Sequence, residues 1–258
     1  MDFGLDDKTA LVTGGAGRIG SEDCRVLAAE GAEVVVLDVD GEAAESVAAD
    51  IEADGGDAVA VECDLTDREA VEETVADLRA TTGGIDVLVN NAAFVDATDQ
   101  LGEFDDDLWD RDVAVNLTGA YNVTKSVFPG MCERGWGRVV NMSSMAGLQG
   151  GFGQASYAAT KAALIEFGKT LALEGAQHGV TANVVVPNIV VGELADLSPA
   201  ELKEVNPMYE RIRQATPMKQ LGREEDVAFL VAYLASEQAR YVTGQAVGVT
   251  GGVDLFSF

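Results

Sequence analysis

The stretch Thr13-Gly14-Gly15-Ala16-Gly17-Arg18-Ile19-Gly20 determines the fold that this sequence predicts. It follows an apolar run at Lys8 to Thr13, which predicts a strand, and leads into Ile19 to Glu30, which predicts a helix. Glycines between a strand and a helix let the backbone turn tightly and approach a pyrophosphate group. The first turn of the helix then presents free N–H groups and the positive end of its dipole to phosphates. Because a glycine-rich turn alone is weak evidence for such a site, the rest of the chain has to supply the context.

Short apolar strands and helices alternate along the remaining sequence. We expect seven strands, at 8–13, 33–38, 58–62, 85–89, 138–142, 181–186 and 245–249. We expect helices at 19–30, 42–53, 67–80, 105–134, 157–177 and 224–236, with Pro129 ending or kinking the fourth. Strands that are apolar throughout are covered on both faces, as in a parallel sheet. The sequence therefore predicts an α/β fold in one domain, residues 1–258: a single-domain, Rossmann-like, doubly wound parallel sheet of about seven strands with helices on both faces.

One segment does not fit the alternation. Residues 192–216 contain Pro199 and Pro207 and two short helical patches, Pro199 to Val205 and Met208 to Gln214. A long, partly helical insertion in a compact domain is often a lid over a binding site. We therefore expect this substrate-loop insertion to shape the substrate pocket.

The composition excludes several classes of protein. The 258 residues include 17 basic and 44 acidic residues, so the net charge is −27. Such a chain would repel nucleic-acid phosphates and anionic lipid, and we expect neither nucleic acid nor membrane as a partner. No apolar run reaches the roughly 18 residues of a membrane span, and the acidic N-terminus lacks a signal-peptide core. Three cysteines without a CxxC pair indicate no metal site and fit a reducing compartment. We expect a cytoplasmic protein, and the acidity fits a salt-rich, halophilic cytosol.

An acidic residue stands at the end of the second expected strand. Asp38 lies 18 residues after Gly20, where a carboxylate can accept hydrogen bonds from the ribose of an adenosine. The same carboxylate would repel a 2′-phosphate, and Val39 offers no positive charge to bind one. We therefore expect NAD, rather than NADP, as the cofactor.

A Tyr-x-x-x-Lys pair indicates proton-transfer chemistry. Tyr157 and Lys161 are four residues apart, so they share one face of a helix. An ammonium near the phenol favours phenolate and lowers the tyrosine pKa from about 10. Such a phenol can exchange a proton with a substrate oxygen near neutral pH. The pair follows a strand that ends in Ser143-Ser144, and Ser144 stands 13 residues before Tyr157.

These motifs together resemble the short-chain dehydrogenase/reductase family, in its subfamily of about 250 residues, over about residues 5 to 253. The resemblance is carried by the glycine turn, Cys63-Asp64-Leu65, Asn90-Asn91-Ala92-Ala93, the spacing of Ser144, Tyr157 and Lys161, and the terminal Val242-Thr243-Gly244-Gln245 and Thr250-Gly251-Gly252. The sequence departs from the family pattern at five places. Arg18 occupies the middle glycine of TGxxxGxG, Ala93 replaces a glycine, Asn188 replaces the glycine of a Pro-Gly pair, Gly192 stands in place of a threonine, and Thr250 replaces a common aspartate.

The resemblance implies roles for individual residues. Tyr157 would be the general acid/base, Lys161 would hold the nicotinamide ribose, and Ser144 would donate a hydrogen bond to the substrate oxygen. Asn116 would help to hold a water molecule in the proton relay. The residues implied to bind the cofactor are Gly14, Gly17, Arg18, Ile19, Asp38, Val39, Asp64, Leu65, Asn90, Ala92, Tyr157, Lys161, Pro187 and Ile189.

The activity so implied is an NAD(H)-dependent oxidoreductase that interconverts a secondary alcohol and a ketone of a small-molecule substrate by hydride transfer. The resemblance also implies a homotetramer in which the long helices at 105–134 and 156–177 pair across subunits. Three alternatives remain. Residues 151–161 resemble 3-oxoacyl-thioester reductases, although those enzymes usually prefer NADP. The glycine spacing TGxxGxxG fits sugar-nucleotide epimerases or dehydratases, which carry an additional substrate domain. A non-catalytic dinucleotide-sensing regulator would usually lack the tyrosine or the lysine.

Overall fold

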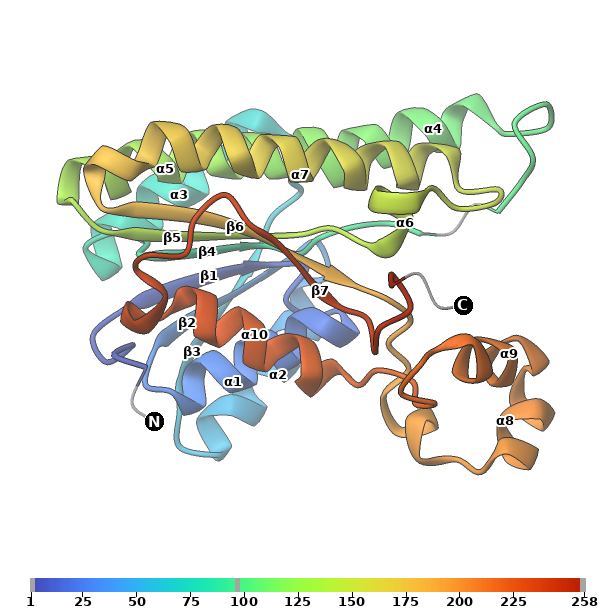
Figure 1. The fold of residues 1–258 in the computed structure, drawn as a ribbon. Helices are drawn as coiled ribbons and strands as arrows, with labels where there is room; N and C mark the ends of the chain where they lie inside the picture. The colour runs from blue at the N-terminus through green and yellow to red at the C-terminus, as the bar shows by residue number, and fades with distance from the viewer. Residues whose placement is uncertain (1–2, 96–97, 256–258) are drawn as a thin grey trace.

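A parallel sheet of seven strands runs through the centre of the molecule (Figure 1). The structure is a computed structural model that describes residues 3–95 and 98–255. The strands are β1 (Thr9–Thr13), β2 (Glu33–Asp38), β3 (Asp57–Glu62), β4 (Val87–Asn90), β5 (Gly137–Met142), β6 (Val180–Pro187) and β7 (Ala246–Val249). Their order is β3-β2-β1-β4-β5-β6-β7, and all neighbours are parallel. The strand order reverses between β1 and β4, and ligands bind beside such a switch point, at the carboxyl ends of the strands.

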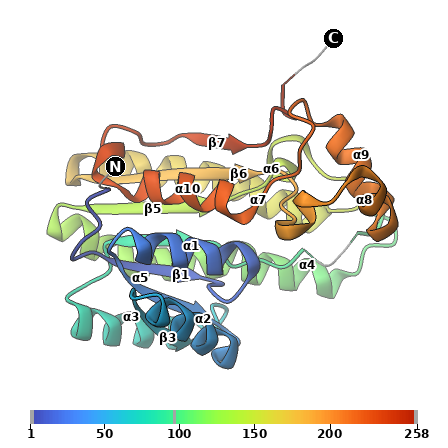
Figure 2. The same cartoon turned by 90° about the horizontal axis from the view of Figure 1, so that it is seen from below.

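Helices cover both faces of the sheet, as Figures 1 and 2 show. One face packs against α1 (Arg18–Ala29), α2 (Gly41–Ala53) and α10 (Glu224–Ala235). The other face packs against α3 (Arg68–Thr82), α5 (Ala120–Arg134) and α7 (Ala155–Gly175). The doubly wound α/β fold that the sequence predicts is therefore confirmed.

Burial explains why the strand pattern was visible in the sequence. Every residue of β1 and of β6 is buried, because helices cover these strands on both sides. The outermost strands β3 and β7 instead have only exposed and half-buried residues. Within the residues described, no helix is long and apolar enough to span a membrane.

The long helix expected at 105–134 consists of three segments. These are α4 (Asp106–Val113), a π-helix at Ala114–Gly119, and α5. Of the two effects expected of Pro129, ending or kinking the helix, the first is wrong, because α5 continues past Pro129 to Arg134. The helix stops where Gly135 adopts a left-handed conformation with φ of 73°, which is a common helix end. A short helix that the sequence did not predict, α6 (Met145–Gln149), follows β5.

The segment 192–216, which we call the lid, extends from one end of the sheet (Figure 1). It contains a 3₁₀ turn at Gly192–Asp196, α8 (Pro199–Val205) and α9 (Pro207–Ala215), so its two expected short helices are present. Its apolar side chains form a separate small cluster around Val191, Leu202 and Leu221. The two ends of the lid lie side by side, because Val190 and Gly222 form a parallel β-bridge.

Candidate active site

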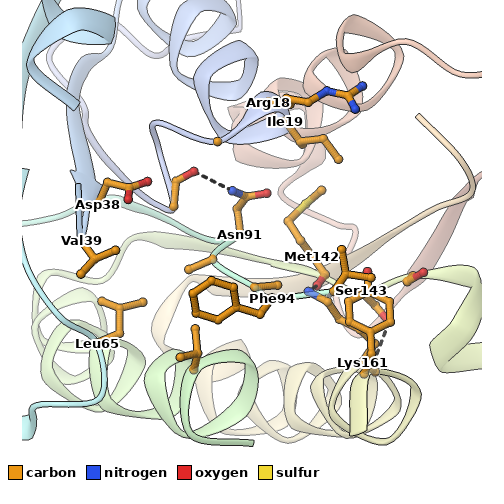
Figure 3. A pocket seen from close by; sticks show the side chains of 18 of the residues that line it. Arg18, Ile19, Asp38, Val39, Leu65, Asn91, Phe94, Met142, Ser143 and Lys161 are labelled. Atoms are coloured by element: carbon orange, nitrogen blue, oxygen red, sulfur yellow. Dashed lines mark hydrogen bonds between the residues drawn. The ribbon is translucent and has the colours of Figure 1, made fainter. Parts of the chain in front are cut away.

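A cleft of about 720 Å³ opens along the carboxyl ends of the strands (Figure 3). Its volume lies in the range of about 300–1,000 Å³ that is usual for small-molecule sites. The segments that line it follow six strands: Gly14 to Ile19 in part, Leu37 to Val39, Cys63 to Thr66, Asn91 to Val95, Met142 to Ser144, and Pro187 to Val190 in part. Arg111, Val115, Tyr157 and Lys161 complete the lining from the helices.

The glycine turn is held tightly against the end of β4. The Nδ2 of Asn91 donates hydrogen bonds to the carbonyl oxygens of Thr13 (3.1 Å) and Gly14 (3.0 Å). Gly14 has a φ of +63°, and a Cβ there would lie 2.8 Å from the Cα of Ala92. A Cβ on Gly20 would lie 2.1 Å from the Gly14 carbonyl oxygen. Side chains at these two positions would therefore disrupt the cradle into which the N-terminus of α1 opens.

The carboxylate of Asp38 closes one end of the cleft. Its Oδ2 accepts a hydrogen bond from the backbone N–H of Ala16 (3.0 Å), and its Oδ1 accepts one from that of Asp40 (3.1 Å). The neighbouring Val39 is 62% exposed and lines the cleft. This end of the site thus offers hydrogen-bond acceptors and negative charge.

Lys161, Tyr157 and Ser144 meet at the other end. The ammonium of Lys161, which is 2% exposed, donates a 2.7 Å hydrogen bond to the Met142 carbonyl and lies 5.7 Å from the centre of the Tyr157 ring. Burial lowers the pKa of Lys161 to about 8. Ser144 caps α6, where its hydroxyl accepts a hydrogen bond from the backbone N–H of Ala146. The Ser144 side chain also forms a hydrogen bond with Tyr157.

The direction of the Tyr157 pKa differs from our expectation. Burial raises this pKa above its usual value, and the hydrogen bond with Ser144 offsets only part of the rise. The prediction that Lys161 lowers the Tyr157 pKa is therefore wrong for this structure, since the cost of removing phenolate from water dominates. At neutral pH the phenol is protonated and can act as a proton donor.

Asn116 lies behind the cleft in the π-helix. Its Oδ1 accepts from the backbone N–H of Phe94 (2.7 Å), and its Nδ2 donates to the Phe94 carbonyl (3.0 Å). Nδ2 also lies 3.5 Å from the Oγ1 of Thr160, one turn after Tyr157 on α7. The Asn116 side chain thus joins the wall of the cleft to the helix that carries Tyr157, and its expected role toward a water molecule stays a prediction.

A family model described as short chain dehydrogenase matches residues 8–202. The chain belongs to this family. The chain is 37% identical to "Nodulation protein G" of Azospirillum brasilense, covering 97% of this chain and 99% of the relative. It is 36% identical to a 3-oxoacyl-(acyl-carrier-protein) reductase of Thermotoga maritima, covering 96% and 98%.

Solved structures agree with this membership. A proposed NAD(P)-dependent gluconate 5-dehydrogenase from Beutenbergia cavernae with bound NADP has a TM-score of 0.89 and 34% identity, covering 98% of this chain and 99% of that one. An NAD⁺-bound xylitol dehydrogenase has a TM-score of 0.88 and 29% identity, covering 96% and 100%. The protein is therefore an oxidoreductase of a family that binds nicotinamide dinucleotides.

The structure brings most of the predicted cofactor residues to the cleft. Those that line it are Gly14, Gly17, Arg18, Ile19, Asp38, Val39, Asp64, Leu65, Ala92, Tyr157, Lys161 and Pro187. Two do not line it. The amide of Asn90 points into the protein, donating to Thr124 Oγ1 and Asn141 Oδ1 at 2.9 Å, and its neighbour Asn91 faces the cleft instead. Ile189 packs against the lid cluster, and its carbonyl accepts from the N–H of Gly222.

Sequence reasoning missed a buried polar pair beside Tyr157. The hydroxyl of Ser156, directly before Tyr157, donates a 2.6 Å hydrogen bond to Oδ2 of Asp112 on α4. The Nη2 of Arg111 donates to the other oxygen, Oδ1, at 3.1 Å. Both Asp112 and Ser156 are 1% exposed. Asp112 stands four residues before Asn116, and Ser156 stands four residues before Thr160. This equal spacing was the available signal, because the Asp112–Ser156 and Asn116–Thr160 contacts both join residues 106–119 to α7.

Over residues 3–95 and 98–255, no group of three or more histidine, cysteine, aspartate or glutamate residues is placed to hold a metal ion.

Proposed function

We propose that this protein is an NAD(H)-dependent dehydrogenase that interconverts a secondary alcohol and a ketone. One observation carries the proposal: Ser144, Tyr157 and Lys161 meet in a cleft whose other end is closed by the carboxylate of Asp38. A proton donor and a binding site for a dinucleotide are thus combined in one cavity.

The donor set fits a dinucleotide without a 2′-phosphate. The glycine cradle, which a Cβ would fill at Gly14 or Gly20, leaves room for a pyrophosphate at the start of α1. Asp38 can accept hydrogen bonds from ribose hydroxyls, and its charge opposes a phosphate. Arg18 carries the positive charge of the glycine turn and could in principle bind a 2′-phosphate. Its guanidinium is instead bound to Glu224 and points away from Asp38 (Figure 3). These contacts favour NAD over NADP.

The residues of the chain supply the acid–base part of the reaction. A bound nicotinamide supplies or accepts the hydride. During ketone reduction, Tyr157 gives its phenolic proton to the substrate oxygen, and during alcohol oxidation it takes a proton back. Ser144 lies within hydrogen-bonding contact of Tyr157 and can donate to the same oxygen. The ammonium of Lys161, which lies 5.7 Å from the centre of the Tyr157 ring, can hold the nicotinamide ribose.

A 3-oxoacyl-thioester reductase is the second candidate. The relative of T. maritima with that activity in its name covers nearly the whole chain. Asp38 weighs against this function, because 3-oxoacyl-thioester reductases usually prefer NADP. Tyr157 and Lys161 in the cleft weigh against a non-catalytic regulator.

The decisive experiment compares NAD with NADP over a panel of secondary alcohols, sugars, hydroxy acids and hydroxyacyl thioesters in high salt. We expect turnover of at least one secondary alcohol, with a preference for NAD. Tyr157→Phe should abolish turnover and leave NADH binding nearly intact. A strong preference for NADP would overturn the cofactor assignment, and retained activity of Tyr157→Phe would overturn the role of Tyr157.

We further propose a cytoplasmic homotetramer. Three large apolar or aromatic side chains on the helices expected to pair across subunits are exposed, namely Trp109 on α4, Tyr121 on α5 and Leu173 on α7. Burying them against a second copy would remove apolar surface from water. Light scattering in high salt should give four times the mass of one chain, and a monomer would contradict the proposal.

A further inference from the structure

Two departures from the family pattern meet at one carboxylate. Arg18, in place of a glycine, donates from Nε (3.0 Å) and Nη2 (2.5 Å) to Oε1 of Glu224, the first residue of α10. Gly192, in place of a threonine, has a φ of +56°, and a Cβ there would lie 2.9 Å from Oε2 of the same glutamate. The arginine thus binds this carboxylate, and the glycine leaves room for it.

The same guanidinium reaches the opposite wall of the cleft. Nη2 of Arg18 donates a 3.1 Å hydrogen bond to the carbonyl oxygen of Val190, the residue at the base of the lid. Arg18 and Val190 both line the cleft, one from the start of α1 and the other from the segment after β6. The arginine therefore spans the cleft beside the turn that faces the pyrophosphate. We call the contact of Arg18 with Glu224 and the Val190 carbonyl the clasp.

The clasp is continuous with the two ends of the lid. Val191 N–H donates to the Gly222 carbonyl (3.0 Å), and Gly222 N–H donates to the Ile189 carbonyl (3.2 Å). Arg223, next to Glu224, forms an ion pair with Asp196 inside the lid. Movement of Glu224 would therefore change contacts both at the glycine turn and at the base of the lid.

We propose that Glu224 is a positioning residue that slows cofactor release by holding Arg18 across the cleft. This proposal rests on the cofactor binding proposed above. The glutamate is suited to the task because its side chain is only 13% exposed, whereas that of Arg18 is 63% exposed and has no comparable packing to fix it. With Glu224 in place, the cation and the Val190 carbonyl close the cleft over the phosphates. Without it, the arginine swings into solvent, and the cofactor leaves more easily.

A pair of isosteric variants tests the clasp. Glu224→Gln breaks the ion pair, and Glu225→Gln removes the same charge from the next residue, which is exposed and makes no hydrogen bond to Arg18. The control matters because loss of a negative charge near phosphates would by itself slow release. The rate of NADH release is measured by stopped flow: excess NAD⁺ displaces the bound NADH, and the change in NADH fluorescence reports its release.

We expect Glu224→Gln to release NADH about five-fold faster than Glu225→Gln, since a two-point, partly buried pair exceeds an ordinary surface pair in strength. In an Arg18→Gln background the Glu224→Gln change should have no further effect, because the glutamate acts through the arginine. Hydrogen exchange of residues 190–196 should quicken in Glu224→Gln, while exchange in α2 stays unchanged.

The outcomes separate the two proposals. If the native protein binds no NADH, the proposed function fails. If it binds NADH but Glu224→Gln and Glu225→Gln release it at the same rate, or Glu224→Gln releases it more slowly, the clasp is overturned and the proposed function stands. An effect of Glu224→Gln that persists in the Arg18→Gln background also overturns it, because the glutamate would then act without the arginine.

Discussion

Replacing Lys161 with Met should make the protein more stable while it removes the activity. The pKa of Lys161 falls from 10.5 to about 8 on burial, and at about 1.36 kcal/mol for each pKa unit this corresponds to roughly 3 kcal/mol of destabilisation at pH 7. The variant also leaves the Met142 carbonyl without its 2.7 Å donor, which costs about 1–2 kcal/mol. We therefore expect Lys161→Met to raise the free energy of unfolding at pH 7 by about 1–2 kcal/mol.

The pH dependence provides the stricter test. Below pH 8 the lysine is protonated in both the folded and the unfolded state, so the penalty is constant. Between pH 8 and 10.5 the native lysine has lost the proton that the unfolded chain still holds, so the stability of the native protein rises with pH. The advantage of Lys161→Met should accordingly shrink by about 2 kcal/mol between pH 7 and 9.5.

Urea unfolding in high salt at the two pH values measures this difference. Lys169→Met is the matched control, because Lys169 lies on the same helix, is 49% exposed and is paired with Glu166. It should leave the pH dependence unchanged. If Lys161→Met is less stable than the native protein at pH 7, or if the two proteins show parallel pH curves, the burial argument is refuted.

Three further predictions concern other parts of the molecule. Asp38→Ala removes the carboxylate that opposes a 2′-phosphate, so the ratio of kcat/KM with NADP to that with NAD should rise by about tenfold or more; an unchanged ratio would contradict the role of Asp38. Asp112→Asn weakens the acceptor for Ser156 and Arg111 and should lower the free energy of unfolding in urea by about 1–3 kcal/mol. The exposed Asp110→Asn should change it by less than about 0.5 kcal/mol, and equal losses would refute the buried pair. Because salt screens the repulsion within a chain of net charge −27, the unfolding midpoint should rise from low to molar KCl, and a flat midpoint would end the halophilic interpretation.

The central strands were predictable because nearly all of their residues are buried and apolar. Residues 33–38, for example, form β2 with the expected bounds, since four consecutive buried apolar residues stand between polar ends. The π-helix at Ala114–Gly119 was not predictable. Apolar periodicity cannot separate one π turn from one α turn, and the polar contacts of Asn116 that accompany it come from distant segments. The helix α6 spans only Met145–Gln149, too short to show a period.

The sequence motifs predicted most of the residues that line the cleft, but they did not predict the pKa values or ion pairs of these residues. The spacing of Ser144, Tyr157 and Lys161 was sufficient to bring the three together, because a strand end and one helix fix their positions. The raised pKa of Tyr157 depends on how deeply the side chain is buried, which a spacing does not reveal. The contact of Arg18 with Glu224 joins residues 206 positions apart, so only the folded chain shows it.

The separate hydrophobic cluster of the lid has an evolutionary consequence. Val191, Leu202 and Leu221 pack with one another and not with the residues that line the sheet. Substitutions within this cluster can therefore be accommodated by repacking among its own members, without changes in the cores beside the sheet. The adjacent ends of the segment at Val190 and Gly222 also make it a natural unit for grafting. A lid from a relative inserted between these two residues would bring its own small hydrophobic core with it, so the segment could be exchanged as one unit.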